Sequence, residues 1–370
     1  MTVLEDQGVS PLMVHAPAAD TPDLSTVRPD VDALLTAFLD RQARLALGPE
    51  TAPLSSELSR LLQRGKRLRP QLCVAGWHAG EGHGAYNDVL HVAGALELFQ
   101  AFALIHDDVM DGSDLRRGRP TAHRALAAVY VAGGGRPSRA EAHGLSAAIL
   151  LGDLALVWSD ELLHRGLGGE ALARILPLMD TMRSELVYGQ YLDLLSTDRL
   201  SDDVEAALRV VRYKTAKYTV EWPLRLGAVL AGATPGVLDA CSAFAVPLGE
   251  AFQLRDDLLG VFGDPAETGK PVGDDIREGK ATVLMALALR EATAAEEQLL
   301  RTLVGRPDLA QEDIFRVRAV LERTKARQQV EEMITSRRDA ALSVLAQAPL
   351  PAAATTALRE IAQIATVRQA

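Results

Sequence analysis

The chain has 370 residues, of which 48% are hydrophobic and only 4% aromatic, and its formal net charge is −10. Its many Ala and Leu residues and short β-branched runs favour helices over sheets. A protein with this net negative charge lacks the overall basic character of nucleic-acid-binding proteins, so we expect no nucleic-acid partner.

The cysteine content and the apolar runs bear on location. Cys73 and Cys241 are too few for a disulfide framework or a cysteine metal site, and they fit a reducing compartment. The first residues lack a basic stretch followed by an apolar one, so no secretory signal is expected. The longest uncharged run, 340–358, contains prolines and hydroxyl residues and makes a poor membrane span. We therefore expect a cytoplasmic protein without an integral membrane segment.

The hydrophobic pattern changes near residue 30. Residues 1–30 mix Pro, Ala, Asp and Thr without periodicity, and they are predicted to form a disordered tail. From Val31 onward, apolar residues recur three and four positions apart, as on one face of a helix. The sequence therefore predicts a single all-α domain over 31–370.

A basic turn, Gly65-Lys-Arg-Leu-Arg-Pro70, comes between apolar helices. Three cations within four residues suit a phosphate group, because Lys supplies a point charge and Arg a planar fork. A solvated basic turn would have the same sequence, and the motif alone leaves both interpretations open.

An acidic cluster ends an apolar helix predicted over Ala93–Asp111. Asp107 and Asp111 are four residues apart and share one helix face, with Asp108 beside them. Burying these carboxylates without partners would be costly, so cations must accompany them. Oxygen-only ligands favour Mg²⁺, which often shares the phosphate oxygens of a substrate. His106 adjoins the cluster, and we expect it to pack nearby because Mg²⁺ prefers oxygen.

A second acidic pair, Asp256 and Asp257, also follows apolar residues, with Gln253 one turn before. Two acidic helix ends could face each other across a cavity and hold several metal ions around one polyanion. Lys270 and Lys280 flank the loop that follows, and this loop could bring cations to phosphates. A single acidic cluster is usually a solvated face or a helix cap, but two in the same setting argue against that interpretation.

These motifs resemble those of the trans-isoprenyl diphosphate synthases, the polyprenyl synthetase family. The first aspartate-rich motif is matched by His106-Asp-Asp-Val-Met-Asp-Gly-Ser-Asp-Leu-Arg-Arg-Gly-Arg-Pro-Thr121. The second is matched by Gln253-Leu-Arg-Asp-Asp257 with Gly269-Lys-Pro-Val-Gly-Asp-Asp-Ile-Arg-Glu-Gly-Lys280. Within the family the chain is most similar to bacterial synthases of geranylgeranyl diphosphate. The resemblance implies a helical bundle around a deep central cavity, a homodimer, and head-to-tail condensation of isopentenyl diphosphate with an allylic diphosphate.

The resemblance also implies roles for the matching residues. Mg²⁺ is the implied cofactor, with three ions per active site held by Asp107, Asp111 and Asp256. The implied catalytic set is Asp107, Asp108, Asp111, Arg116, Lys214, Asp256 and Asp257. The implied substrate-binding set is Lys66, Arg69, Gln100, Arg116, Arg117, Lys214, Thr215, Gln253, Lys270 and Lys280. Gln190 and Asp193 resemble a family motif on the helix that faces the first cluster.

One position departs from the family pattern. The second motif is often Asp-Asp-x-x-Asp, and its last position is here Gly260. One acidic group is missing, and Asp264 and Asp274 further along the chain need not replace it. Activity is still expected, but the binding geometry of a third metal ion is in doubt.

Product length is expected to depend on the helix before the first cluster. Ala103 lies one turn, about 6 Å, below Asp107 on the same stripe, so it leaves a path for the growing chain open. Phe102 is rotated away and should narrow this path without closing it. In the resembling family a single aromatic at the position of Phe102 accompanies C20 products. We expect geranylgeranyl diphosphate, with farnesyl diphosphate second and a longer chain third.

Two other functions remain open at this point. A class I terpene cyclase would share the fold and the first motif, but its usual Asn-Asp-x-x-Ser-x-x-x-Glu motif is absent from the sequence. A non-catalytic subunit of a heteromeric synthase would tend to lose its aspartates, which are present here.

Overall fold

The computed structural model describes residues 24–82, 85–197, 199–264 and 273–366. Within these ranges the chain is almost entirely helical, and its one sheet is a two-stranded hairpin. The all-α prediction is confirmed. Helix α1 (Leu24–Arg44) begins before Val31, where the domain was expected to start, and the rest of the predicted tail lies outside the described residues.

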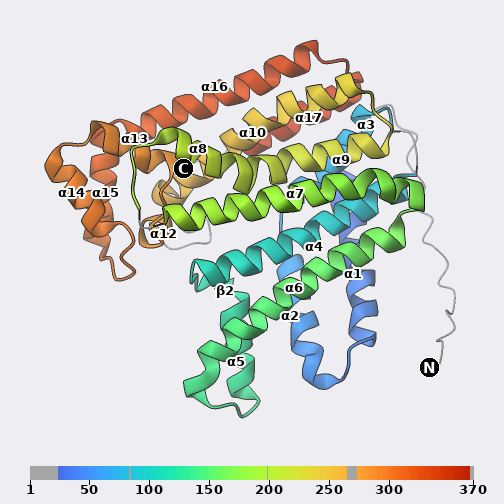
Figure 1. Cartoon of the computed structure of the whole chain (residues 1–370), viewed down its shortest axis with the longest axis horizontal. Helices are drawn as coiled ribbons and strands as arrows, with labels where there is room; N and C mark the ends of the chain where they lie inside the picture. Colours follow the sequence, from blue (N-terminus) through green and yellow to red (C-terminus); the bar gives the residue numbers. More distant parts are fainter. Residues whose placement is uncertain (1–23, 83–84, 198, 265–272, 367–370) are drawn as a thin grey trace.

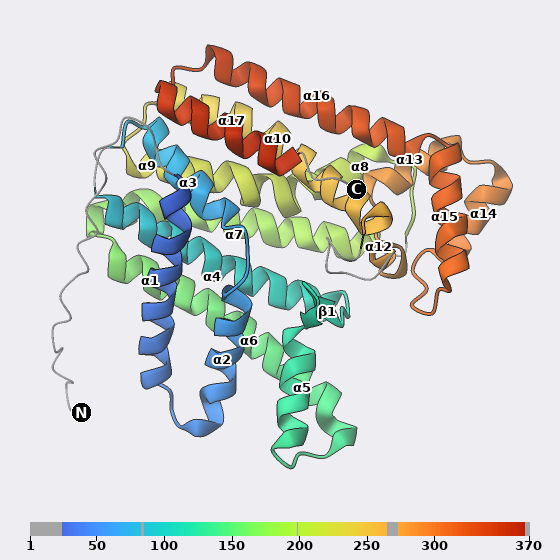
Figure 2. The same cartoon turned by 180° about the vertical axis from the view of Figure 1, so that it is seen from behind.

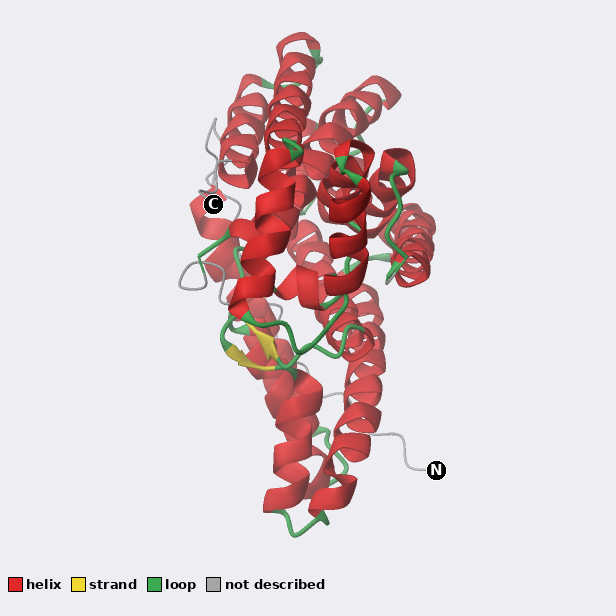
Figure 3. Cartoon of the chain, turned by 90° about the vertical axis from the view of Figure 1, so that its left-hand side faces the viewer, coloured by secondary structure: helices red, strands yellow, loops and turns green. Residues whose placement is uncertain are grey.

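The N-terminal half is arranged around α4 (Tyr86–Met110), which α6 and α7 flank in Figure 1. Its other helices are α2 (Ala52–Leu62), α3 (Leu68–Ala79), α5 (Ala122–Ala132), α6 (Ala140–Gly166) and α7 (Gly169–Ser196), with short 3₁₀ turns at Pro49–Thr51 and Pro137–Arg139. Strands β1 (Leu115–Arg116) and β2 (Arg119–Pro120) pair antiparallel just after α4, as Figure 3 shows.

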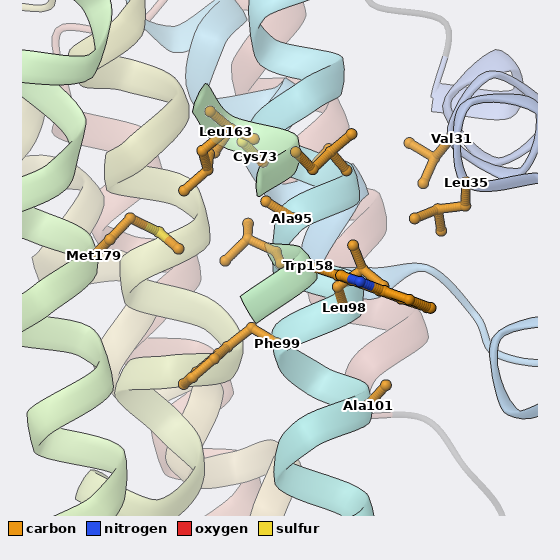
Figure 4. Close-up of a cluster of buried hydrophobic side chains, with 14 of the residues drawn as sticks. Val31, Leu35, Cys73, Ala95, Leu98, Phe99, Ala101, Trp158, Leu163 and Met179 are labelled. Carbon is orange, nitrogen blue, oxygen red and sulfur yellow. The ribbon is translucent and has the colours of Figure 1, made fainter. Parts of the chain in front are cut away.

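Helix α4 is apolar on most of its surface because it passes through the core. Leu98 and Phe99 are almost fully buried there, together with Trp158 of α6 and Met179 of α7 (Figure 4). Burying such side chains stabilises the fold by about 1.5–3 kcal/mol each. The core therefore holds α4 firmly, and with it the acidic cluster at its C-terminal end.

The C-terminal half contains two long helices, α10 and α16, that pack along each other in Figure 1. Its elements are α8 (Val204–Val210), the π-helix η3 (Val211–Glu221), α9 (Trp222–Leu230), α10 (Pro235–Phe262), α12 (Asp274–Arg277), α13 (Val283–Glu291), α14 (Ala294–Leu303), α15 (Gln311–Arg323), α16 (Ala326–Gln347) and α17 (Ala352–Thr366). Seen from behind in Figure 2, α17 lies beside α16, while α13, α14 and α15 gather at one end. Helix α12 lies near the same end as the C-terminus of α4 (Figure 1).

The π-helix η3 lies between α7 and α10 at very short range. A Cβ atom added to Gly189 of α7 would lie 2.4 Å from the backbone N of Lys214 in η3. A Cβ added to Gly249 of α10 would lie 2.6 Å from the Cα of Ala216. Only glycine permits this approach, which lets η3 sit deep enough to present its side chains between the two halves. π-Helical turns frequently occur at functional sites.

Three helical segments are long and apolar enough to cross a membrane by length and composition: Tyr86–Met110, Pro137–Gly166 and Pro235–Phe262. In the first, 67% of the most apolar window is buried inside the protein, and in the second only 28%. The expected absence of an integral membrane segment is therefore not confirmed.

Candidate active site

A cavity of about 910 Å³ lies between the N-terminal and C-terminal halves. Helices α4, α7 and α10, the π-helix η3, the turn before α3 and the residues after α12 all contribute to its lining. Thirteen residues singled out in the sequence line it: Lys66, Arg69, Gln100, Ala103, Asp107, Arg116, Arg117, Lys214, Thr215, Gln253, Asp256, Asp257 and Lys280. Lys270 lies outside the described residues. Folding therefore gathers polar groups from distant parts of the chain around one space.

The three aspartates at the end of α4 have different surroundings. Asp107 lines the cavity and accepts hydrogen bonds from Lys214 Nζ at 3.0 Å and Gln190 Nε2 at 3.1 Å. Asp108 is buried, and both its oxygens lie 2.8 Å from Arg116 Nε. Each carboxylate thus has a protein cation or amide as a partner in the ligand-free cavity.

Asp107 and Asp111 ionise differently because cations are unevenly distributed around them. Burial acts to raise the pKa of Asp107, but the charges of Lys214, Lys280 and Arg116 outweigh it and hold that pKa well below its usual range. Burial raises the pKa of Asp111 to about 6, since Lys280 offsets only part of the effect and Asp107 adds a like charge. A further cation near Asp111 would favour its ionised form.

Lys214 connects η3 to both α4 and α7. Its Nζ lies 3.0 Å from Asp107 Oδ1 and 2.5 Å from Asp193 Oδ2. Burial acts to lower the pKa of Lys214, but these carboxylates raise it overall, so the lysine carries its charge. Asp193 and Gln190 therefore hold Lys214 and Asp107 in position from α7.

The second acidic pair lies on α10, facing the cavity. Gln253 Nε2 donates a hydrogen bond of 2.7 Å to Asp257 Oδ1, so in this structure the Gln253 amide is the hydrogen-bond partner of the Asp257 carboxyl group. Burial raises the pKa of Asp257 to about 7, with the hydrogen bond from Gln253 acting against it and the charges of Asp275 and Asp256 adding to it. Burial and the neighbouring carboxylates thus both favour the protonated form of Asp257 in the ligand-free protein.

Lys280 joins the acidic end of α4 to the carboxylates of α12 and of the residue that follows it. Its Nζ lies 3.4 Å from Asp111 Oδ2, 3.6 Å from Asp275 Oδ1 and 2.6 Å from Glu278 Oε2. Burial acts to lower the pKa of Lys280, but the surrounding carboxylates raise it well above its ordinary value. A single buried ammonium group thus stands between the cluster on α4 and the segment that follows α10.

The basic turn splits into two kinds of cation. Lys66 is exposed at the cavity lining, and Arg69 donates to Thr219 Oγ1 at 2.6 Å. Arg67 is only 4% exposed, and its guanidinium bonds Glu97 at 2.5 Å and Asp32 at 2.8 Å. Arg67 therefore fixes the turn to α1 and α4, whereas Lys66 and Arg69, the two residues predicted to bind phosphate, line the cavity.

Arg117 ties the β-hairpin to the same turn. Its Nη1 donates to the carbonyl oxygen of Arg64 at 2.6 Å, and its backbone has a φ of 52°. Burial and the neighbouring arginines lower the pKa of Arg117. Arg116 points instead to the acidic cluster, so the two adjacent arginines serve opposite walls of the cavity.

The residues expected to guide the growing chain differ in exposure to the cavity. Ala103 lines it, whereas Phe102 packs with its ring centroid 4.8 Å from that of His106. His106 Nε2 lies 3.1 Å from the carbonyl oxygen of Ile149, so this ring nitrogen contacts α6. Further down α4 from Asp107, about one turn past Ala103, the buried Oε1 of Gln100 has no hydrogen-bond partner within the described chain. A ligand or water is needed to satisfy that oxygen.

A family model described as Polyprenyl synthetase matches residues 52–322. The chain belongs to the polyprenyl synthetase family. It is accordingly an enzyme that transfers prenyl groups.

The relatives of this polyprenyl synthetase make products of several lengths. The geranylgeranyl diphosphate synthase of Saccharolobus solfataricus is 31% identical over 311 residues, which are 82% of this chain and 87% of the relative. The geranylfarnesyl diphosphate synthase of Aeropyrum pernix is 33% identical, over 70% of this chain and 75% of the relative.

The solved structures include a similar synthase with its ligands. The geranylgeranyl pyrophosphate synthase from Corynebacterium glutamicum was solved in complex with isoprenyl diphosphate and magnesium. It superposes with a TM-score of 0.90 at 42% identity, covering 94% of this chain and 100% of that one. The fold of the polyprenyl synthetase described above is thus shared over nearly its whole length.

Polyprenyl synthetases use divalent metal ions, and the cavity fits one that is shared with a ligand. Within the described ranges, no three His, Cys, Asp or Glu side chains are grouped as a preformed metal site. Lys214, Lys280 and Arg116 hold the carboxylates instead. The cavity of about 910 Å³, lined by Asp107, Asp256 and Asp257, has room for a cation and a ligand that supplies oxygens to it. Mg²⁺ bound mainly through phosphates and a few carboxylates has this character.

Some residues of the site had no assigned role in the sequence. Arg67 was grouped with its neighbours, and only its buried ion pair with Glu97 separates it from them. Asp275 and Glu278 lie within the 269–280 segment, where acidic and basic residues are mixed. The order of these charges along the sequence does not predict which of them form ion pairs. Tyr218, whose ring lies 4.2 Å below the Arg69 guanidinium, reads in the sequence as an ordinary core residue.

Proposed function

We propose that this polyprenyl synthetase condenses isopentenyl diphosphate head-to-tail with an allylic diphosphate to give mainly geranylgeranyl diphosphate, using Mg²⁺. The observation that carries the proposal is the pairing of two acidic helix ends and a basic turn around one cavity. The acidic ends suit a diphosphate bound with metal ions, and the basic turn suits a second diphosphate bound directly. Prenyl transfer between two diphosphates requires both.

Asp107, Asp111 and Asp256 would hold the metal, which supplies Lewis-acid stabilisation of the leaving diphosphate. Arg116, Lys214 and Lys280 are half-buried protein cations that would neutralise the same developing charge. Lys270 and Thr215 are proposed to assist them. As the allylic C–O bond breaks, its electron pair leaves with the diphosphate.

Isopentenyl diphosphate would bind at the opposite wall. Lys66 and Arg69 are proposed to hold its phosphates, while Gln100 contributes the buried polar group between the two sites. The double bond of this substrate attacks the allylic carbon and forms the new C–C bond. The proton lost from the adduct is proposed to go to the departing diphosphate, because the carboxylates at the end of α4 in the described part of the chain are already paired with Lys214, Lys280 and Arg116.

The C20 product is supported by the wall below Asp107 and by the relatives. Ala103 leaves the stripe open for one turn, and Phe99, only 1% exposed, lies on the same stripe one turn further down. Geranylgeranyl diphosphate synthases are prominent among similar proteins, whereas farnesyl or longer products are the alternatives.

We also propose that the enzyme is a cytoplasmic homodimer with three Mg²⁺ ions per site. An exposed apolar stripe on α7, formed by Val187, Tyr188, Tyr191, Leu194 and Leu195, supports self-association. Ile149, Leu150 and Val157 add exposed apolar area on α6. Both cysteines are free and buried, which suits a reducing compartment.

The direct test is an assay of purified protein with Mg²⁺, isopentenyl diphosphate and geranyl or farnesyl diphosphate. We expect a mainly C20 diphosphate by chromatography after dephosphorylation. A cyclised hydrocarbon would identify a terpene cyclase, and turnover only after addition of a second subunit would identify a non-catalytic component; either would overturn the proposal.

The metal assignment is tested by Asp107→Ala and Asp256→Ala. Each should lower kcat by about a hundredfold or more, as the loss of one electrostatic contact in a preorganised site typically does. Asp40→Ala, an exposed carboxylate on α1, is the matched control and should leave turnover unchanged. Near wild-type turnover in either variant at saturating Mg²⁺, with intact helical circular dichroism, would remove that residue from the metal site.

A further inference from the structure

The missing third acid of the second motif leaves a specific space on α10. Gly260 lies one helical turn after Asp256, so a side chain there would stand on the same face as the acidic pair. Gly260 itself lines the cavity. The departure from the family pattern is therefore at the cavity wall, where an added side chain would matter.

The carboxylate of another residue already fills that space. A Cβ added to Gly260 would lie 1.8 Å from Asp275 Oδ2 and 2.4 Å from Asp275 Cγ. Real Cβ atoms are never this close to other atoms, so any side chain at position 260 would displace Asp275 or shift α12. Asp275 can rest against α10 because residue 260 is glycine.

Asp275 reaches this place from α12. This short helix follows Gly273, whose φ of 70° is in the left-handed region that favours glycine. A Cβ added to Gly273 would lie 2.9 Å from Ile314 of α15, so α12 is packed closely on that side. Asp275 is 8% exposed, lines the cavity, and has Lys280 Nζ 3.6 Å from its Oδ1.

We propose that Asp275 supplies the third carboxylate of the second acidic motif, and that Gly260 is the residue that admits it. The motif is then complete in space although it is broken in sequence. Asp275 then contributes negative charge to the site of the divalent cation held at Asp256. Lys280 remains beside Asp275 as its partner. This inference depends on the Mg²⁺-diphosphate site proposed above.

The charges around α10 agree with this assignment. Asp256, Asp257 and Asp275 all line the cavity, and Asp275 lies against α10 at Gly260, one helical turn after Asp256. Carboxylate oxygens that line one space are the ligands a divalent cation prefers. The alternative is that Asp275 serves only as a partner for Lys280. In that case its contact with Gly260 would not affect metal binding.

The test measures Mg²⁺ affinity rather than activity. Full-length protein is titrated with Mg²⁺ at saturating inorganic pyrophosphate, and binding is followed by calorimetry. Asp275→Asn keeps the shape and removes the charge, and should weaken Mg²⁺ binding by about tenfold or more, as loss of groups around a metal typically does. Asp274→Asn makes the same charge change one residue earlier, outside the cavity lining, and should stay within about twofold.

An exchange of the two side chains separates charge from packing. Gly260→Asp alone should weaken binding, because the new side chain collides with Asp275. The double variant Gly260→Asp/Asp275→Gly moves the carboxylate from α12 back to α10 and should recover most of the affinity. Gly260→Ala is the steric control, and should resemble Gly260→Asp alone.

Two outcomes would overturn the inference: wild-type Mg²⁺ affinity in Asp275→Asn, or a double variant no better than Gly260→Asp. If the wild-type protein itself binds no Mg²⁺ with pyrophosphate, the proposed function fails as well. If the wild type binds Mg²⁺ but Asp275→Asn is indistinguishable from it, only the role of Asp275 is lost. Circular dichroism of each variant checks that the helices have formed.

Discussion

At the scale of single residues, lysine side chains of the protein neutralise the carboxylates of the ligand-free cavity. Lys214 lies against Asp107, and Lys280 lies between Asp111 and Asp275. A buried charge without a partner is far more costly than a paired one, so these contacts stabilise the ligand-free protein. Under the proposed function, the same ammonium groups would turn to phosphates when a metal takes over the carboxylates. Folding and the proposed reaction would then use one set of side chains.

The two diphosphate sites should respond separately to mutation. A hydrogen bond to a charged group contributes about 1.5–3 kcal/mol, so Lys66→Ala should raise the KM for isopentenyl diphosphate about tenfold or more. Lys214→Ala should instead lower kcat and impair use of the allylic substrate, because Lys214 contacts Asp107. Steady-state kinetics with each substrate varied in turn measures both effects.

Arg44→Ala removes an exposed cation at the end of α1 and serves as the control for Lys66→Ala. Equal changes for both substrates in either lysine variant would contradict the division between the two walls.

Asp257 should make the metal-free protein less stable as the pH rises. Its pKa of about 7 lies above the ordinary value of 3.8 for an aspartate, so the folded protein keeps a proton that the unfolded chain releases. The resulting stability is complete below about pH 4 and is lost as the pH approaches 7. Asp257→Asn should therefore have a higher Tm than wild type at pH 8, and the difference should vanish toward pH 4.

Thermal melts of both proteins in chelator, from pH 4 to pH 8, measure this difference. Comparing the two proteins cancels the titration of histidines and other groups. A constant difference in Tm across the range would show that Asp257 does not hold its proton in the folded state.

At the scale of elements, the N-terminal part of α4 is buried in the core, whereas its C-terminal end carries the acidic cluster. Its stripe of Asp107, Ala103 and Phe99 runs from the acidic cluster into the core, one turn at a time. Phe99 has its ring centroid 5.4 Å from that of Phe102 and 5.9 Å from that of Tyr218. Phe102 does not line the cavity, so its influence on the product would pass through Phe99.

Ala103→Phe should shorten the main product from C20 to C15. The new ring would fill the stripe about 6 Å below Asp107, where the growing chain is expected to pass. Phe102→Ala should lengthen the product, because it removes a ring that supports Phe99. Product ladders with geranyl and farnesyl primers measure both changes. A main product of C20 from Ala103→Phe would place the end of the path on another helix.

At the scale of the whole molecule, α6 and α7 leave apolar side chains in solvent on either side of α4 (Figure 1). On α7 these residues recur at helical spacing from Val187 to Leu195, as on a face that packs against another helix. Exposed apolar patches of this kind commonly mark interaction surfaces. A second copy of the chain is the partner that we propose.

Glutamate at Leu150 and Tyr188, which are 62% and 68% exposed, should break this association. Light scattering after size exclusion should give twice the chain mass for wild type and one chain mass for Leu150→Glu/Tyr188→Glu. Phe315→Glu on α15 makes the same kind of change at a residue 54% exposed and should leave the dimer intact. A wild-type monomer, or a dimer unaffected by the double change, would exclude this interface.

The sequence by itself determined what helical geometry controls. Asp107, Asp111 and Ala103 share a face because residues four apart always do, and the apolar residues before them made α4 a core helix. The two acidic motifs and the basic turn likewise named many of the charged residues that line the cavity. These features are local, so no knowledge of distant contacts was needed.

Only the tertiary structure decided which charges meet. Arg67 has the same chemistry as Arg69, but the packing of α1 and α4 buries it on Glu97 and Asp32. Lys280 reaches Asp111, and Asp275 rests against Gly260, because α12 folds back onto α10. Such pairings join residues far apart in the chain and depend on how whole helices pack. Spacing along the sequence therefore carries no signal for them.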